Sequence, residues 1–220
     1  MDRWIQPKYK LKSLPTYMSN PMLPTLTVIF IGPQGSGKGT QIDKLDAVLS
    51  KLDPTNRVVD IQTGRRFRAM AAQSEGYTEE RINETLDSGI LQPLFLSVHL
   101  WGDAMRTYLD EKCHLLIDGF PRVVPEAVVL ESALAFYKRN PLYVINLDTP
   151  EEIVRARMMG RARKDDTPDS IEARLAWYRN ETLPVVQYYR DRPNTTVIDI
   201  DGVDTIDGVH GQICRALNIS

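Results

Sequence analysis

A glycine-rich loop that contains a lysine is the stretch of this sequence best suited to chemistry. The residues from Gly32 to Gln41 read Gly-Pro-Gln-Gly-Ser-Gly-Lys-Gly-Thr-Gln, directly after an apolar run that ends at Ile31. In such a loop, backbone N–H groups surround a phosphate, and the start of the following helix adds partial positive charge. Lys38 adds a cation for the terminal phosphates of a nucleotide. The loop therefore predicts the binding of nucleoside phosphates.

The spacing of this loop fits the general phosphate-binding pattern with one departure. The pattern places Ser or Thr directly after the lysine, whereas Gly39 follows Lys38 here and Thr40 comes one position late. A plain glycine-rich turn between a strand and a helix is the alternative, but the lysine in register argues against it. The residues expected to contact the phosphates of the donor nucleotide are Gly35, Ser36, Gly37, Lys38, Gly39 and Thr40.

The elements that must position this loop alternate between strands and helices. Strands are predicted over 26–31, 57–61, 115–117, 142–147 and 196–200. Helices are predicted over 37–52, 66–73, 78–88, 93–111, 125–138, 149–159 (Thr149 as the N-cap and Pro150 at N1), 205–217, and from a cap at Thr167 past residue 179, with Pro184 kinking or dividing it. Short apolar strands alternating with helices indicate an α/β fold, a five-stranded parallel sheet with helices on both faces.

Two polar segments follow predicted strands in the same way as the loop does. Thr63-Gly64 comes after the second predicted strand, and Asp118-Gly119 comes after the third. Because ligands of such sheets bind at the carboxyl ends of the strands, we expect these segments and the loop to converge on one crevice.

Composition excludes several other classes of protein. The net charge of −2 over 220 residues argues against bulk nucleic-acid binding. Cys113 and Cys214 are far apart and predict neither a metal site nor a disulfide framework, which suits the cytoplasm. No apolar run approaches the roughly 18 residues of a membrane span, and no secretory signal is visible. The three histidines are scattered and are interpreted as structural: His99, His114 and His210.

Residues 1–24 form a separate segment that is basic and rich in proline. Four prolines rule out a long helix, and three lysines lie between residues 8 and 12. The segment is either a tail that lies loosely on the protein or is disordered, or one that makes a specific contact. The side chains available for such a contact are Trp4, Ile5, Tyr9 and Tyr17.

With these motifs in view, the sequence resembles the adenylate kinase branch of the nucleoside monophosphate kinases. The resemblance covers about residues 25–220 and includes the glycine between the lysine and the threonine of the loop. The other matching motifs are Thr63-Gly64 with Arg68, the segment Asp118-Gly-Phe-Pro-Arg122, and Arg157, Arg161, Arg163, Asp165-Asp166 and Arg174 in their order and spacing.

The resemblance implies a P-loop NTPase fold of the nucleoside monophosphate kinase type and an activity. ATP would give its terminal phosphoryl group to a nucleoside monophosphate, AMP before others, so that ATP and AMP become two ADP. It further implies a monomeric kinase domain over 25–220, with an acceptor-binding insertion at about 62–100 and a very short lid at about 161–165. Mg²⁺ would be needed, and zinc would not, because this lid has no cysteine.

The resemblance also assigns roles to individual residues. Arg68 and Arg122 would hold the acceptor phosphate, and Asp118 would orient Mg²⁺ through water. Arg161, Arg163 and Arg174 would close over the donor and the transferred group, while Arg157 would stack on the donor base. Lys38 completes the catalytic set, and the acceptor site is expected to comprise Thr63, Gly64, Arg68, Leu91, Gln92, Gly119, Arg122, Glu126, Arg163 and Arg174. Taken singly, Arg157 and Arg161 also fit one solvated helix face, or pairs with Glu152 and Asp165.

Two positions depart from the family's pattern. Arg65 stands where an aspartate is usual, and Glu126 stands where a glutamine usually faces the acceptor base. An ionised carboxylate accepts from the adenine amino group but cannot donate to its ring nitrogen, whereas guanine offers it two adjacent donors. Weaker discrimination against GMP is therefore the hypothesis, and sharper discrimination is expected for Glu126→Gln. The alternative is that Glu126 pairs with Arg122 or Arg65.

Two other functional classes fit the sequence less well than a kinase. A GTPase-like switch requires an Asn-Lys-x-Asp base-reading motif, which this sequence lacks. A silent nucleotide-binding module, with a partner for the N-terminal segment, would not need Lys38, Asp118 and the arginine set together. An enzyme of the phosphotransferase class is therefore the prediction.

Overall fold

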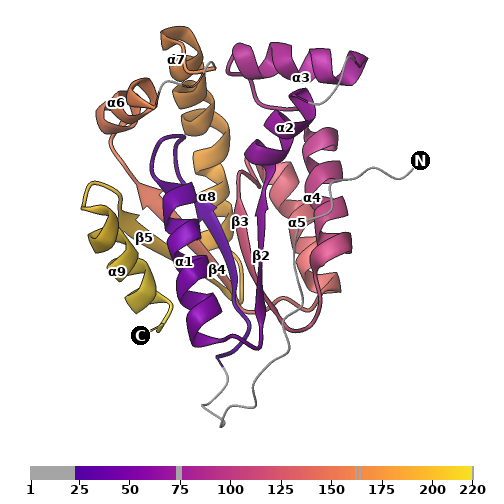
Figure 1. Ribbon diagram of the computed structural model, residues 1–220, viewed down its shortest axis with the longest axis vertical. Helices are drawn as coiled ribbons and strands as arrows, with labels where there is room; N and C mark the ends of the chain where they lie inside the picture. The colour runs from indigo at the N-terminus through magenta and orange to yellow at the C-terminus, as the bar shows by residue number, and fades with distance from the viewer. Residues whose placement is uncertain (1–22, 73–75, 162, 164, 220) are drawn as a thin grey trace.

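The computed structural model describes residues 23–72, 76–161, 163 and 165–219 (Figure 1). Nearly all of the basic N-terminal segment, including the side chains considered for a specific contact, lies outside the described residues. Two residues of the predicted lid, at 162 and 164, lie outside them as well.

A five-stranded sheet forms the centre of the molecule, and every neighbouring pair of strands is parallel. The sheet has the order β2-β3-β1-β4-β5, so the first strand is central and β2 and β5 are the edge strands. This arrangement confirms the predicted fold class. The strands are β1 (Thr27–Ile31), β2 (Arg57–Gln62), β3 (Cys113–Asp118), β4 (Leu142–Asp148) and β5 (Thr195–Asp201).

Helices cover both faces of this sheet (Figure 1). Alternate residues of β1 point to opposite faces: Val28 and Phe30 pack with α1 and α9, whereas Ile29 and Ile31 pack with α4, α5 and α8. All five β1 residues are buried, as expected for a strand covered on both sides. The helices are α1 (Lys38–Leu52), α2 (Thr63–Ala71), α3 (Tyr77–Asp87), α4 (Leu94–Tyr108), α5 (Val124–Phe136), α6 (Glu151–Gly160), α7 (Pro168–Trp177), α8 (Leu183–Arg190) and α9 (Ile206–Ala216).

Several helix boundaries differ from those predicted, by one to three residues. Helix α2 begins at Thr63 rather than at residue 66, because Thr63-Gly64 forms its first turn instead of a loop. Helix α4 ends at Tyr108, three residues before the predicted end. Helix α6 begins at Glu151 with Pro150 at the N-cap, and the Thr149 hydroxyl has no hydrogen-bond partner among the described residues. The predicted threonine cap at this helix is therefore wrong.

The predicted cap of α7 is confirmed in detail. The Thr167 hydroxyl accepts from the Ser170 N–H at 3.2 Å, while the Ser170 hydroxyl accepts from the Thr167 N–H at 3.0 Å. A π-helical turn (Tyr178–Thr182) separates α7 from α8, and Pro184 lies in the first turn of α8. A proline cannot donate to the carbonyl four residues earlier, so the helix widens before it. This divides the long helix as predicted.

Buried polar side chains join elements at the edge of the sheet opposite the carboxyl ends of the strands. His114 is fully buried, and its Nδ1 accepts from the Leu26 N–H at 3.1 Å. Its Nε2 lies 3.3 Å from a carboxylate oxygen of Asp53. Since Nδ1 acts as an acceptor, the ring is the neutral Nε2–H tautomer. This histidine is structural, as interpreted from the sequence.

Within the described parts of the chain, none of the helices combines the length and the apolar character that crossing a bilayer requires.

Candidate active site

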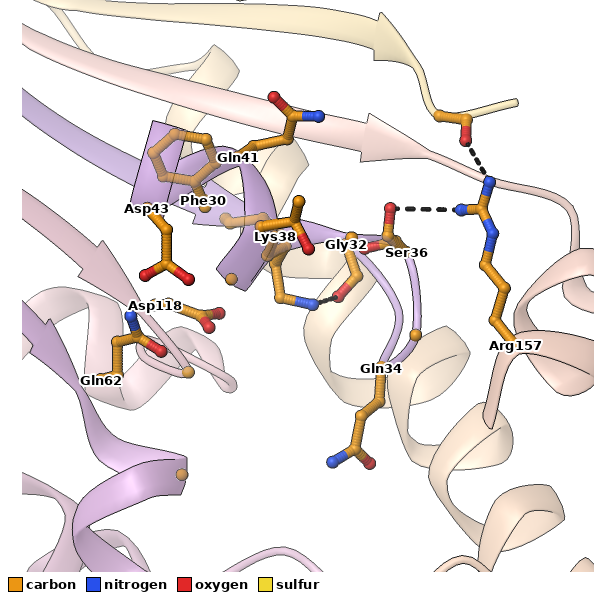
Figure 2. A pocket seen from close by; sticks show the side chains of 18 of the residues that line it. Phe30, Gly32, Gln34, Ser36, Lys38, Gln41, Asp43, Gln62, Asp118 and Arg157 are labelled. Carbon is orange, nitrogen blue, oxygen red and sulfur yellow. Dashed lines mark hydrogen bonds between the residues drawn. The ribbon is translucent and has the colours of Figure 1, made fainter. Parts of the chain in front are cut away.

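Two adjoining pockets open where the strands end. The larger has a volume of about 740 Å³ and is lined by the glycine-rich loop, the ends of β2 and β3, and the segment after β5 (Figure 2). The smaller has a volume of about 130 Å³ and lies between α3, α4, α5 and α7. The residues that line both pockets are Gln34, Gly64, Arg68, Gly119, Arg122 and Trp177.

The structure brings the predicted site residues together around these pockets. Every predicted donor residue lines the larger pocket, as do Asp118 and Arg163. Leu91, Gln92 and Arg174 line the smaller one. Of the predicted residues, Thr63 lines neither pocket: it is buried behind Gly119, where a Cβ atom on that glycine would lie 2.6 Å from the Thr63 hydroxyl.

The loop before α1 leaves the start of that helix open to the larger pocket. Gly37 precedes the helix with φ of 101°, a left-handed conformation that favours glycine, and no side chain caps the helix. A Cβ atom on Gly37 would meet nothing within 4 Å, so the space beside the loop is open. The Ser36 hydroxyl is buried without a hydrogen-bond partner among the described residues. These features together suit a bound phosphate.

The Lys38 ammonium group lies at the centre of the loop. It donates to the carbonyl oxygens of Gly32 at 2.8 Å and Pro33 at 2.9 Å, and Figure 2 shows it pointing back into the loop. Burial lowers the pKa of Lys38 to about 8, partly offset by the Asp118 carboxylate and reinforced by Arg122. The positive charge is thus costly here without an anion, and a polyphosphate would supply one.

Asp118 ends β3 on the same side of the loop as Gln62, its partner on β2 (Figure 2). One Asp118 carboxylate oxygen is buried without a hydrogen-bond partner among the described residues. Asp60 lies on β2, two residues before Gln62. Burial raises the pKa of Asp60 to about 6, although the hydrogen bond from Gln62 acts in the opposite direction. No group of three or more His, Cys, Asp or Glu side chains is placed to hold a metal ion in the described ranges.

Arg122 is fixed at almost every polar atom except the ends of its guanidinium group. Its backbone N–H donates to Glu126 at 2.7 Å, and its backbone carbonyl accepts from Thr182 at 2.9 Å. Its Nε donates to the Gly119 carbonyl at 2.7 Å. The guanidinium carbon lies 5.1 Å from the centre of the Trp177 ring. The terminal nitrogens therefore face the junction of the two pockets from a well-defined position.

A second arginine group lies on the lid side. Asp166 binds Arg161 Nη2 at 2.9 Å and Arg174 Nη1 at 2.6 Å, while Asp165 binds Arg174 Nη2 at 2.8 Å. Burial opposes ionisation of Asp166, but the hydrogen bonds and charges of Arg161 and Arg174 outweigh it and lower its pKa. The pairing considered for Arg161 therefore involves Asp166 rather than Asp165.

The remaining arginines concentrate positive charge around the larger pocket. The pKa of Arg68 is lowered mainly by burial and next by the charge of the neighbouring Arg163. The pKa of Arg163 is lowered mainly by burial and next by the charge of Arg161. Arg157 donates to the carbonyl of Gly202 at 3.1 Å and lies 3.5 Å from that of Ser36 (Figure 2). Such closely placed like charges favour the binding of a polyanion.

Glu126 is 2% exposed and forms part of the wall of the smaller pocket. One carboxylate oxygen accepts from the Ser97 hydroxyl at 2.6 Å and the Trp101 N–H at 3.2 Å, and the other accepts from the Arg122 N–H. The pairing with Arg122 thus uses the backbone rather than the guanidinium group. Arg65 instead lies 3.3 Å from Asp43 on the surface.

Gln62 and Trp177 are among the pocket residues that the sequence did not predict. Gln62 lines the larger pocket directly before the Thr63-Gly64 motif, so its position beside a known motif was the available signal. Trp177 lines both pockets, but nothing in the spacing around it distinguishes it from a packing residue of a helix.

Comparisons with known proteins agree with this geometry. Residues 30–194 match the family model for adenylate kinase. The adenylate kinase of Mycobacterium tuberculosis (strain ATCC 25618 / H37Rv) is 34% identical over 192 residues, which cover 87% of this chain and 99% of that protein. The adenylate kinase of Corynebacterium aurimucosum is 32% identical over 86% of this chain and 97% of its own length. Adenylate kinase 1 of Nostoc sp. (strain PCC 7120) is 36% identical over 79% and 90%.

The matched range begins at the end of β1 and includes the glycine-rich loop and the two segments that follow β2 and β3. It also includes the four arginines Arg157, Arg161, Arg163 and Arg174. The resemblance inferred from the motifs is therefore confirmed over most of the chain. The chain belongs to the adenylate kinase family.

Proposed function

We propose that the protein transfers the terminal phosphoryl group of ATP to AMP, giving two molecules of ADP. The observation that carries the proposal is the pair of adjoining pockets with Arg68 and Arg122 in their shared wall. The larger pocket contains the phosphate-binding loop and has room for a nucleoside triphosphate. A monophosphate in the smaller pocket would present its phosphate at the junction, where both arginines can contact it.

The protein's task in this reaction is positioning and charge neutralisation. Phosphoryl transfer needs no side-chain nucleophile, because the acceptor phosphate oxygen attacks the terminal phosphorus of the donor directly. Lys38 and the loop N–H groups would hold the donor phosphates, Arg122 and Arg68 the acceptor phosphate, and Arg161, Arg163 and Arg174 the group in transfer. Guanidinium groups suit this role because they are planar and remain charged.

We further propose that Asp118 contributes to binding Mg²⁺ through water. An enclosed carboxylate oxygen without a partner fits a hydrated hard cation, which takes few ligands from protein and several from water and phosphate. When bound, the ion would neutralise negative charge on the phosphates. The protein's own part is to hold Asp118 at the end of β3, opposite Gln62 and close enough to Lys38 to affect its pKa. No zinc is expected.

The acceptor base is proposed to be adenine, read in part by Glu126. An ionised carboxylate has about four acceptor positions, and three are used by Ser97, Trp101 and Arg122. One position remains for the single amino group of adenine, whereas the two donors of guanine would need two. Leu91 and Gln92, on the other wall, would complete the contact with the base. The preference rests on about one hydrogen bond and is therefore moderate.

The proposed arrangement is a monomeric domain over 25–220 with two moving parts. Residues of about 62–100 would close over the acceptor, and those of about 161–165 over the donor, excluding water as a competing acceptor. A cytoplasmic location is proposed, in keeping with two free cysteines in the described residues.

The test is a coupled assay of ADP formation from ATP with AMP, GMP, CMP and UMP in turn, with and without EDTA. We expect the highest kcat/KM with AMP and loss of turnover when EDTA removes Mg²⁺. An equal rate of ADP formation when the monophosphate is omitted would indicate hydrolysis of ATP. A preference for CMP or UMP as the acceptor would contradict the assigned base site.

A further inference from the structure

One face of α7 contacts the C-terminal end of α3. Ser170, Arg174 and Trp177 lie on this face at positions i, i+4 and i+7. The Arg174 Nη2 atom donates to the Leu86 carbonyl at 3.2 Å, and the Trp177 indole N–H donates to the Gly89 carbonyl at 2.9 Å. A Cβ atom on Gly89 would lie 2.6 Å from the Ser170 carbonyl oxygen, so the two backbones are in close contact.

These contacts add donors to one carbonyl in the last turn of α3 and to one just beyond its end. Helix α3 ends in a Schellman-type arrangement, in which the Ile90 N–H donates to Thr85 and the Gly89 N–H to Leu86, with Gly89 at φ of 67°. Its last turn contains no basic residue. Helix α7 supplies the two donors at this end, the Arg174 guanidinium group and the Trp177 indole N–H. It thereby connects α3 to the helix that follows the predicted lid.

The ring of Trp177 also contacts the central arginine of the site. The Arg122 guanidinium carbon lies 5.1 Å from the ring centre, within the range of a cation–π contact. The Nε atom and the backbone of Arg122 are held by Gly119, Glu126 and Thr182, so the indole ring is what supports the face of the guanidinium group. Trp177 is half-buried and lines both pockets.

We propose that Trp177 is a positioning residue for phosphoryl transfer, through two separate contacts. Its ring fixes the plane of Arg122 at the junction of the pockets, and its N–H holds the end of α3 against α7 through Gly89. The acceptor segment and the arginine that meets the acceptor phosphate are thereby placed by one side chain. This inference rests on the proposed function and adds a residue to it.

Two substitutions separate the contacts. Trp177→Phe keeps an aromatic ring over Arg122 but removes the N–H donor, so it should raise KM for AMP about 3- to 10-fold with kcat little changed. Trp177→Leu removes both contacts and should also lower kcat, by about 5- to 30-fold. KM for ATP should stay near the wild-type value in both variants.

The matched control is Tyr178→Leu, an aromatic-to-aliphatic change at the next residue, which lines neither pocket. Its kcat and its KM for AMP should resemble those of the wild type, and thermal unfolding checks that each variant is folded. Equal kcat values for Trp177→Leu and Tyr178→Leu would overturn the role of the ring. An unchanged KM for AMP in Trp177→Phe would overturn the role of the N–H group.

Tryptophan fluorescence tests the inference independently of turnover. Binding of AMP should change the emission of the wild-type protein, and most of this change should be lost in Trp177→Phe. A change of equal size in the two proteins would overturn the placement of Trp177 beside the acceptor. A wild-type protein that binds AMP with this signal yet transfers no phosphoryl group would contradict the proposed function alone.

Discussion

At the scale of single residues, Lys38, Asp118 and Arg122 form no salt bridge within the described residues, whereas Arg161 and Arg174 do. Lys38 donates to two backbone carbonyls, and the Asp118 carboxylate is the principal negative charge that favours its protonated form. The guanidinium ends of Arg122 face open space at the junction of the pockets. Such an arrangement costs folding free energy, and it is typical of sites in which a ligand brings the missing charge.

Removing the lysine tests this account of the loop. Lys38→Ala should fold but lose about 100- to 1000-fold in kcat, because a fixed cation at the transferring phosphates disappears. Steady-state kinetics with saturating ATP and AMP measure the loss. Lys44→Ala is the matched control: Lys44 is on the same helix, 2.8 Å from Asp207, and lines neither pocket. Near-normal turnover of Lys38→Ala would refute the assignment of the loop.

The substitution Glu126→Gln has two expected effects. The ratio of kcat/KM for AMP to that for GMP should rise up to about tenfold, because an amide can donate to the adenine ring nitrogen. The free energy of unfolding should fall by about 1–3 kcal/mol, because an amide nitrogen would face one of three donors, Ser97, Trp101 or the Arg122 N–H. An unchanged ratio would mean that Glu126 does not read the base.

The loop, Thr63-Gly64 and Asp118 could be predicted from their places after strands, whereas the roles of the arginines and of Glu126 came from the resemblance to the family. Lys38, Thr63 and Asp118 each come within a few residues of a short apolar run, and a parallel sheet brings such positions to one edge. Trp177 could not be found in this way, because its contacts are with Gly89 and Arg122, 88 and 55 positions away in the sequence. The partners of Glu126 depended likewise on how α4 packs against α5.

At the scale of elements, the glycines and caps determined how well boundaries were predicted. The cap at Thr167 is visible in the sequence, and the structure confirms it and adds a reciprocal hydrogen bond from the Thr167 N–H to Ser170. The helix predicted from residue 66 begins at Thr63 instead and includes Gly64, because its start packs against the turn at Gly119. Tertiary contact outweighed local propensity there.

The two segments proposed to close over the substrates should respond to a ligand that occupies both pockets. A bisubstrate dinucleotide, with two adenosines joined by a phosphate chain, should slow amide hydrogen exchange in residues of about 62–100 and in those of about 161–165. Helix α8, which lines neither pocket, provides the internal reference and should change less. Unchanged exchange in both segments would contradict closure.

At the scale of the whole molecule, the two ends of the strands differ in function. The carboxyl ends of the strands carry the charged site, whereas the opposite edge is joined by buried polar contacts such as those of His114 with Leu26 and Asp53. Burial lowers the pKa of His114 despite the Asp53 carboxylate. The folded protein therefore depends on a neutral imidazole at a position remote from the pockets.

This dependence predicts a loss of stability in mild acid. A histidine whose pKa is lowered in the folded state is protonated more readily when unfolded, so its stabilising contribution is complete above the ordinary value of about 6.5 and is lost below it. Between pH 7.5 and 5.5 we expect the free energy of unfolding to fall by about 1 kcal/mol through this residue. Urea unfolding at the two pH values measures it.

Two variants identify the residue responsible. His114→Asn should be less stable at pH 7.5 but should lose less on acidification, since it has no imidazole to protonate. His99→Asn changes an exposed histidine and should keep the wild-type pH dependence. An identical pH dependence in wild-type protein and His114→Asn would show that another group is responsible.

The central claim is that a phosphoryl group passes from one nucleotide to another. Phosphorus NMR of ATP and AMP with Mg²⁺ and the wild-type protein tests it most directly, because it follows every phosphate at once. The account predicts that each ATP consumed is matched by one AMP consumed and two ADP formed, with no inorganic phosphate. Release of inorganic phosphate while AMP stays constant, or no change in either nucleotide, would contradict it.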